Sequence, residues 1–231
     1  MDTYINSKVL DLGKVMRGVY LKMCLGILLT AITSFVLLTY FPAVITFMAM
    51  HSWLFWTLAL IEIGFVIIMG MNLKDGGMKK TTAKLMFYAF AILNGITLAP
   101  IFLVYTTTNI SLAFFITAGM FGVMTAYGYF TKRDLSGWGD FLLMALIGLI
   151  ICLIVEFFVH STMFSFLVSC AAVLIFTGLT AWDTQMIKEM VKETDTDEET
   201  DKISTFGALS LYLDFINLFL HILRILGEFN K

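Results

Sequence analysis

Seven apolar runs, each about as long as a bilayer is thick, constrain most strongly what this chain can fold into. About 20 mainly apolar residues are needed to cross ~30 Å of hydrocarbon. A segment exposed to lipid must satisfy its backbone hydrogen bonds within itself, so each run is expected to be a helix. The predicted spans are Val19–Tyr40, Trp53–Leu73, Ala83–Val104, Ile110–Phe130, Phe141–Val159, Met163–Trp182 and Phe206–Gly227. The sequence therefore predicts an all-α polytopic membrane protein with seven transmembrane helices.

Composition agrees with this interpretation and excludes several classes of protein. Of the 231 residues, 59% are hydrophobic and 14% are charged, against roughly 45–50% and 25% in a soluble domain. Seven spans take up about 140 residues, so we expect residues 1–18 to form an N-terminal segment and residues 19–228 a single seven-helix domain. A net charge of −2 gives no electrostatic reason to expect nucleic acid. The expected surroundings are the lipid bilayer.

The distribution of basic residues predicts the orientation of the chain. Thirteen of the fifteen Lys and Arg residues lie before or just inside the first span or between spans two and three, four and five, and six and seven. The segments on the opposite side, around residues 41–52, 105–109 and 160–162, contain no Lys or Arg. Because cytoplasmic loops carry the excess of positive charge, the N-terminus is predicted to be cytoplasmic and the C-terminus external.

The seventh apolar run carries an unusual series of small and polar residues at alternating steps of three and four. Such steps place all of them on one helix face. The face is either a buried polar seam, which holds helices together through hydrogen bonds, or an intermittently wet path for a cation or proton. The series consists of Gly207, Ser210, Asp214, Asn217, His221 and Arg224.

Carboxyl groups at membrane depth are the strongest candidates for function, because each requires a partner or water. Asp183 ends the sixth run and Asp214 lies within the seventh, and two antiparallel neighbours can turn both toward one cavity. A pair there would repel, respond to pH and offer oxygen ligands to a divalent cation, calcium above all. Alternatively, Asp183 is simply solvated among the headgroups. Glu62, within the second run, is either a third carboxylate at a gate or half of a structural salt bridge. The acidic run Thr194–Asp201 is expected to be a solvated loop.

Several local motifs resemble those of the Bax inhibitor-1 family, in particular its bacterial branch. The resemblance extends from about Met16 to Gly227, nearly the whole chain. The motifs that carry it are Met16-Arg17-Gly18-Val19-Tyr20, Asn94-Gly95-Ile96-Thr97-Leu98, Thr131-Lys132-Arg133-Asp134-Leu135, Thr177-Gly178-Leu179-Thr180-Ala181-Trp182-Asp183-Thr184-Gln185 and Ala208-Leu209-Ser210-Leu211-Tyr212-Leu213-Asp214-Phe215-Ile216-Asn217.

The resemblance implies a fold, a function and a set of site residues. The fold is six helices around a central seventh, and family members are described as pH-sensitive calcium leak channels that influence stress responses and cell death. The paired aspartates of the family correspond to Asp183 and Asp214, and its second-span glutamate to Glu62. A basic latch residue near the end of span two is replaced by Asn72, so Lys74 would have to serve instead. A bacterial inner membrane is the implied location.

These observations predict a passive, pH-sensitive leak for a cation, with calcium as the expected ion and no cofactor. Asp183 and Asp214 would bind the ion or sense the proton, Glu62 and Arg224 would tune the gate, and Asn217 and His221 would lie along the path.

Two other classes of function are open. One is a modulator of membrane-protein quality control or stress signalling, which would act through a membrane-protein partner without transport. The other is an intramembrane aspartyl protease, since two aspartates on neighbouring helices suit acid–base cleavage. Against the protease, Leu211-Tyr212-Leu213-Asp214 lacks the Gly-x-Gly-Asp turn, so we do not expect an enzyme.

Overall fold

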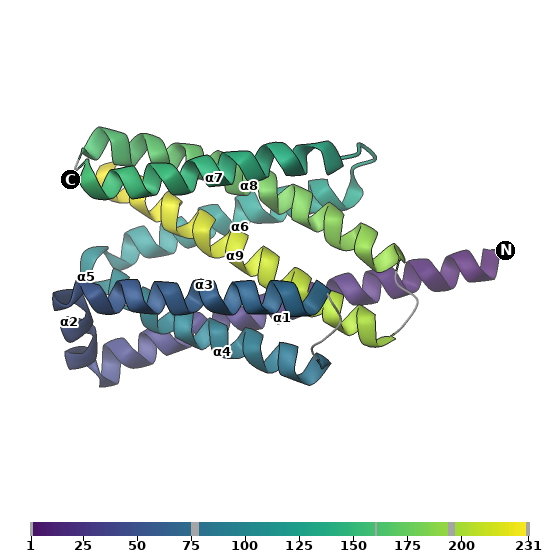
Figure 1. The fold of residues 1–231 in the computed structure, drawn as a ribbon, viewed down its shortest axis with the longest axis horizontal. Helices are drawn as coiled ribbons and strands as arrows, with labels where there is room; N and C mark the ends of the chain where they lie inside the picture. The colour runs from purple at the N-terminus through teal and green to yellow at the C-terminus, as the bar shows by residue number, and fades with distance from the viewer. Residues whose placement is uncertain (1, 75–78, 160, 194–196, 230–231) are drawn as a thin grey trace. The chain divides into compact units, whose positions relative to one another are not determined.

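A computed structural model describes residues 2–74, 79–159, 161–193 and 197–229, although not the side chains of residues 2–11, 52, 72–74, 197, 198 and 229. The described residues form helices joined by short connections, with no strand among them (Figure 1). The helices are α1 (Asp2–Tyr40), α2 (Pro42–Met50), α3 (Ser52–Lys74), α4 (Lys80–Leu98), α5 (Ile101–Val104), α6 (Thr107–Phe130), α7 (Ser136–Phe158), α8 (Thr162–Glu193) and α9 (Asp197–Phe229).

Within the part of the chain that the structure describes, seven segments are long and apolar enough to cross a membrane, which confirms the predicted all-α architecture with seven spans. They are Leu12–Tyr40, Trp53–Met71, Lys80–Val104, Thr107–Phe130, Ser136–Phe158, Thr162–Glu193 and Glu199–Glu228. The last of these is the most buried. In its most apolar stretch of 18 residues, 67% of the residues are buried, against 39% in Lys80–Val104, the next most buried segment. Its burial agrees with the small and polar face predicted for it. A central position for this helix stays a prediction.

Two helical features depart from the simple pattern of apolar runs. The segment between the first two spans, predicted as a loop, contains α2, which begins with Pro42 in the first turn, where its missing N–H is no loss. The third span is divided into α4 and α5 around Pro100. Proline cannot donate a hydrogen bond to the preceding turn, so the helix stops at Leu98. Beyond the proline, the chain continues with hydrogen bonds between residues three apart, such as that from the Leu103 N–H to the Pro100 carbonyl at 3.0 Å.

The acidic run before the last span is also more ordered than predicted. Residues 194–196 lie outside the described part of the chain, but Asp197 begins α9 and Asp201 lies within it. Acidic residues in the first turns are favoured by the positive end of the helix dipole, which explains why a helix starts in this charged segment. The prediction of a solvated loop is therefore wrong for residues 197–201.

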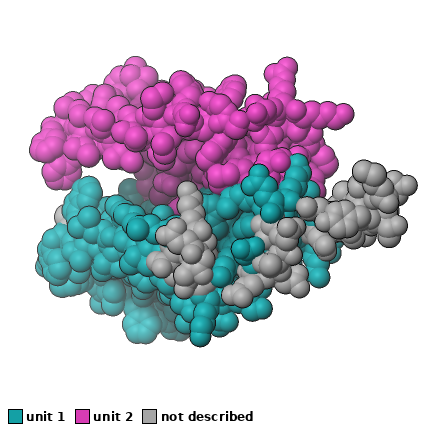
Figure 2. Space-filling view, turned by 45° about the vertical axis from the view of Figure 1, so that its right-hand side comes forward, with its two compact units in different colours: residues 1–104, 190–212 teal, residues 105–189, 213–231 magenta. Residues whose placement is uncertain are grey.

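The chain forms two compact units, shown in different colours in Figure 2. Unit 1 comprises residues 1–104 and 190–212, and unit 2 comprises residues 105–189 and 213–231. Helix α9 contributes its first half to unit 1 and its second half to unit 2. Each unit has its own buried interior and is described separately.

In unit 1, α4 packs against α1 and α3, and α2 contacts both α1 and α3. Two glycines allow close approach there. A Cβ on Gly95 would lie 2.6 Å from the Thr30 carbonyl oxygen, and one on Gly26 would lie 2.7 Å from the Phe87 ring. Small residues at such contacts let helices pack tightly in a membrane. The side chains of Phe87 and Phe90 are fully buried and meet the ring of Tyr212 edge-on.

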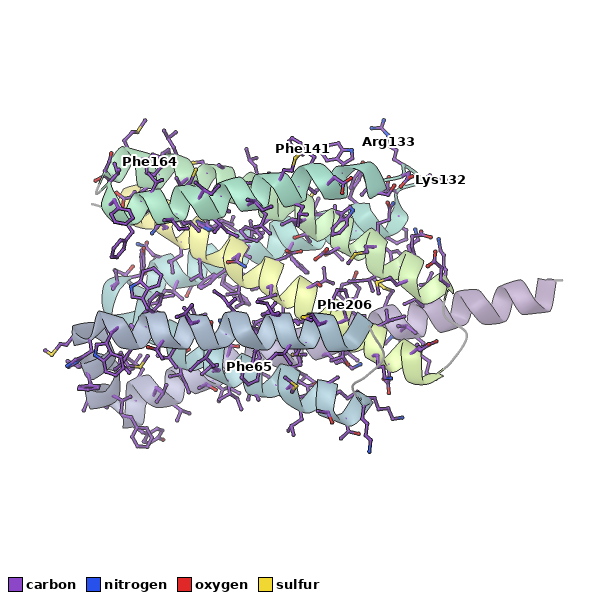
Figure 3. The ribbon with its side chains drawn as sticks, viewed as in Figure 1. Phe65, Lys132, Arg133, Phe141, Phe164 and Phe206 are labelled. Carbon is purple, nitrogen blue, oxygen red and sulfur yellow. The ribbon has the colours of Figure 1, made fainter. Side chains whose placement is uncertain are left out.

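In unit 2, α8 is held against its neighbours by similar contacts. The backbone of Gly128 on α6 lies against Ala181, and a Cβ on Gly139 of α7 would lie 2.7 Å from the Trp182 indole. The outer faces carry large apolar side chains such as Phe141, which is 62% exposed on α7 (Figure 3). This exposure suits a surface that faces lipid tails.

Candidate functional site

Two aspartates in the interior of unit 2 are in direct contact. Asp183 lies on α8 and Asp214 on α9, with 8% and 5% of their surfaces exposed. Their carboxyl groups are hydrogen-bonded to each other. A hydrogen bond between two carboxyl groups requires that one of them holds a proton. The Oδ2 atom of Asp214 is buried without a hydrogen-bond partner among the described residues, so the pair has an unused acceptor in a place where polar atoms are normally paired.

The segment of α8 around Asp183 is fixed by side-chain bonds to the loop between α6 and α7. The Gln185 amide donates to the Arg133 carbonyl at 2.9 Å and accepts from the Leu135 N–H at 2.7 Å. Lys188, one turn further along, donates to the Tyr129 carbonyl at 2.9 Å. Figure 3 shows Lys132 and Arg133 in this same loop. These bonds attach the part of α8 that follows Asp183 to the end of α6 and to the α6–α7 loop. They add to helix packing in fixing the position of Asp183.

Further along α9, the polar face continues to an ion pair. Arg224 Nη1 lies 2.9 Å and 3.0 Å from the two carboxylate oxygens of Glu156 on α7. Ser165 on α8 donates to the same carboxylate at 2.7 Å. His221 is buried and stacks on the Phe176 ring at 6.2 Å between centroids. Asp214 and Arg224 are separated by about 15 Å at 1.5 Å per residue, so an acidic pair and an ion pair occupy the two ends of this half of the helix.

Asn217 lies between those ends and is half-buried. Its amide donates to the Leu213 carbonyl of its own helix at 2.8 Å. One N–H and the side-chain oxygen remain for other groups or water. This residue therefore presents polar atoms on the face between the aspartates and the ion pair.

In unit 1, Glu62 heads a chain of hydrogen bonds that crosses four helices. Its two carboxylate oxygens accept from Thr97 at 2.6 Å and from Asn94 at 3.2 Å, both on α4. Tyr212 on α9 donates to the Asn94 oxygen at 3.0 Å, and its hydroxyl lies 2.6 Å from that of Thr30 on α1. The partners of Glu62 in this network are neutral, so the alternative of a structural salt bridge receives no support from these contacts.

Near the start of α9, the carboxylate of Asp201 lies close to three lysines. The sequence analysis used these lysines only to predict the orientation of the chain. Its carboxylate lies 3.6 Å from Lys22 on α1, and 3.9 Å and 3.2 Å from Lys80 and Lys84 on α4. Lys22 also donates to Ser204 at 2.9 Å. This group joins three helices at one end of unit 1.

The structure brings together some predicted site residues and leaves others apart. Asp183 and Asp214 meet, while Glu62 belongs to a separate network in the other unit. The side chain of Lys74 lies outside the described residues, so its latch role stays a prediction. The sequence analysis did not assign roles to Glu156, Asn94 or Tyr212. A signal was present for Glu156, because an acid within a span requires a partner and Arg224 is a basic residue within another span.

A resident metal would need more ligands than these residues bring together. Among the described residues, no group of three or more His, Cys, Asp or Glu side chains could hold a metal ion. The aspartate pair offers at most four oxygens, whereas calcium takes six to eight. Any cation at the pair would therefore keep much of its water.

Comparison with known proteins identifies the family of this chain. The family model described as "Inhibitor of apoptosis-promoting Bax1" matches residues 12–231. The chain belongs to the Bax inhibitor-1 family. Among members of that family, the chain is 41% identical to the inner membrane protein YbhL of Escherichia coli K12 over 215 residues, which cover 92% of this chain and 91% of YbhL.

Two further relatives match along nearly their whole length. An uncharacterized protein of Rickettsia prowazekii is 38% identical over 99% of this chain and 96% of its own. An uncharacterized membrane protein of Streptococcus pyogenes is 36% identical over 97% of this chain and 96% of its own. The Bax inhibitor-1 resemblance suggested by the motifs is thereby confirmed, and the chain is a multi-pass membrane protein.

Proposed function

We propose that this protein is a passive, pH-sensitive cation leak of the bacterial inner membrane, with calcium as its ion and the Asp183–Asp214 pair as its gate. The observation that carries the proposal is the hydrogen bond between these two buried carboxyl groups, together with the unpartnered Oδ2 of Asp214. The location rests on the seven spans and on the name of YbhL.

The gate works by exchange of a proton for a cation. While a proton is shared, the two carboxyl groups hold α8 and α9 together at this level. When the proton leaves, two negative charges in a place of low dielectric constant repel each other strongly. A cation then relieves the repulsion, or the helices separate there. Low pH closes the path in this mechanism.

Weak binding suits a leak. Conduction requires that an ion be attracted to the path yet released from it. Two carboxylates provide fewer oxygens than a tight calcium site, so the ion keeps part of its hydration shell and can leave.

Beyond the pair, the polar face of α9 supplies the rest of the path. Asn217 and His221 lie along it, and Arg224 stands at its far end in contact with Glu156. An unpaired guanidinium would repel a passing cation, so the Glu156 contact neutralises a barrier at that end. Glu62 tunes the gate from its own network, which includes Tyr212, two residues before Asp214 on the same helix.

Calcium flux into liposomes that contain only the purified protein tests the proposal. Flux is measured from about pH 5 to 8 for the wild type, for Asp183→Asn with Asp214→Asn, and for Asp134→Asn, which makes the same chemical change in a loop. We expect flux that rises with pH in the wild type and in Asp134→Asn, and a flat profile in the double variant.

Two results would overturn the proposal. One is flux no greater than in empty liposomes while the protein is folded by circular dichroism. The other is a double variant whose pH profile equals that of the wild type. Absence of flux would instead favour the modulator function, and crosslinking in native membranes would then identify the partner.

A further inference from the structure

Three ammonium groups converge at one end of unit 1 on a single carboxylate. Lys22, Lys80 and Lys84 all lie within 4 Å of Asp201. These four side chains, which we call the lysine cluster, carry a surplus of two positive charges. The surplus persists although like charges at this separation repel, which indicates a place where a further anion would be stabilised.

The helix that carries two of these lysines adds to the positive field. Helix α4 begins at Lys80, its first turn contains no acidic residue, and the side chain of the preceding Lys79 makes no capping hydrogen bond. The N-terminus of a helix is the positive end of its dipole, where acidic residues are usually preferred. Basic residues there are unfavourable unless an anion is near, and Asp201 supplies only one negative charge.

The cluster is open to its surroundings on the side of α4. The side chains of Lys80 and Lys84 are 56% and 37% exposed, whereas that of Lys22 is 14% exposed and is held by Ser204. Lys22 is therefore a fixed part of the structure, whereas the two α4 lysines, although paired with Asp201, are exposed enough to contact a molecule from outside.

Apolar side chains lie one helical turn from the cluster, further along the membrane spans. Leu25, three residues after Lys22 on α1, is 51% exposed, and Tyr88, four residues after Lys84 on α4, is half-buried. Residues three and four apart share a helix face. Ammonium groups at the end of a span, with the exposed Leu25 and the half-buried Tyr88 ring one turn further into the membrane, match a phospholipid, which has a charged headgroup above acyl chains.

We propose that the lysine cluster binds the phosphate of an anionic phospholipid, with the acyl chains along the outer faces of α1 and α4. The positive-inside orientation places this lipid in the cytoplasmic leaflet, where anionic headgroups attract basic segments. Asp201 holds the lysines together and limits the affinity, so the lipid competes with its carboxylate for Lys80 and Lys84. This site is independent of the aspartate pair and of ion flux.

Native mass spectrometry of the delipidated full chain measures this binding directly. The protein is titrated with phosphatidylglycerol and with phosphatidylcholine of the same acyl chains. The variant Lys80→Gln with Lys84→Gln is compared with a matched control, Lys132→Gln with Arg133→Gln, which removes the same charge from the α6–α7 loop. We expect the wild type and the control to prefer phosphatidylglycerol, and the α4 variant to lose this preference by about tenfold.

A second variant changes binding in the opposite direction. Asp201→Asn removes the competing carboxylate, so phosphatidylglycerol should bind several-fold more tightly than to the wild type. The proposal is overturned if Asp201→Asn weakens binding, or if the α4 variant and the loop control lose the preference equally. Displacement of the lipid by soluble glycerol phosphate would also overturn it, because it would show a site for free phosphate. Both variants are checked for unchanged helix content.

Discussion

Each of the two units holds carboxyl groups within its membrane-spanning helices, half-buried at Glu62 in unit 1 and buried at Asp183 and Asp214 in unit 2, and the hydrogen bonding of these groups differs. In unit 1, both oxygens of Glu62 accept hydrogen bonds from Thr97 and Asn94. In unit 2, Asp183 and Asp214 bond to each other, and the buried Oδ2 of Asp214 has no hydrogen-bond partner among the described residues. One site resembles the interior of a stable protein, where polar groups are paired, and the other does not.

This difference suggests that the two sites have different roles. A network in which every polar group is hydrogen-bonded holds helices in a single arrangement. A site with an unpaired acceptor and two acidic groups is costly to maintain, and such cost is typical of functional sites in membrane proteins. We therefore expect changes in the Glu62 network to affect mainly stability, and changes at the aspartate pair to affect mainly the response to protons and cations.

The largest effect on stability is expected from Asn94→Leu. The substitution removes the donor to one Glu62 oxygen and the acceptor of the Tyr212 hydroxyl, so two hydrogen bonds are lost while the contacts of Glu62 with Thr97 and of Tyr212 with Thr30 remain. The free energy of unfolding should fall by about 1–3 kcal/mol. Reversible unfolding in mixed detergent micelles measures this change.

The same substitution on α9 serves as the matched control. The Asn217 amide bonds only to the carbonyl of its own helix among the contacts described above, so Asn217→Leu should change the free energy of unfolding by less than Asn94→Leu. Equal losses in the two variants would show that the network around Glu62 has no special structural role.

A smaller effect of opposite sign is expected from Asp214→Asn. The Asn amide can donate to Asp183 without a shared proton, so the contact survives at every pH and the repulsion between two carboxylates is removed. The free energy of unfolding near neutral pH should stay the same or rise by about 1 kcal/mol, and its dependence on pH should become weaker. A loss of stability comparable to that of Asn94→Leu would contradict the distinction between the two sites.

The sequence predicts the fold of this chain well and the site only in part. Apolar runs identify the seven spans because lipid leaves the backbone no alternative to a helix. The break at Pro100 and the start of α9 at Asp197 were missed, since hydropathy does not register a lost backbone donor or the attraction of acidic residues to a helix N-terminus. Helical spacing placed Asp214 and Arg224 on one face, but it could not show that Asn94 and Tyr212 link Glu62 to α9, because such contacts depend on how separate helices pack.

The smallest effect is expected outside the spans, at an acid whose surroundings contrast with both buried sites. Asp134 precedes α7 in an exposed loop and accepts the Ser136 N–H at 2.9 Å. Hydrogen bonds from the side chain and the backbone of Ser136 hold the pKa of Asp134 below its ordinary value of 3.8. A lowered pKa in the folded state means that the ionised form stabilises the start of α7 at pH values above about 4. The stabilisation is lost as the pH falls below 3.8 and through the lower folded value.

Amide hydrogen exchange at the first turn of α7 detects this change. In the wild type, the protection factor of the Ser136 amide should decrease on acidification below about pH 4. In Asp134→Asn the side-chain oxygen still accepts but cannot ionise, so protection should not change with pH. Equal acid sensitivity in the two proteins would assign the effect to another group. Because this exposed acid is screened by water and is bonded to the neutral Ser136, its titration should leave the rest of the fold intact. A proton at Asp134 thus affects one helix end, whereas a proton at the Asp183–Asp214 pair determines whether two carboxyl groups can remain in contact.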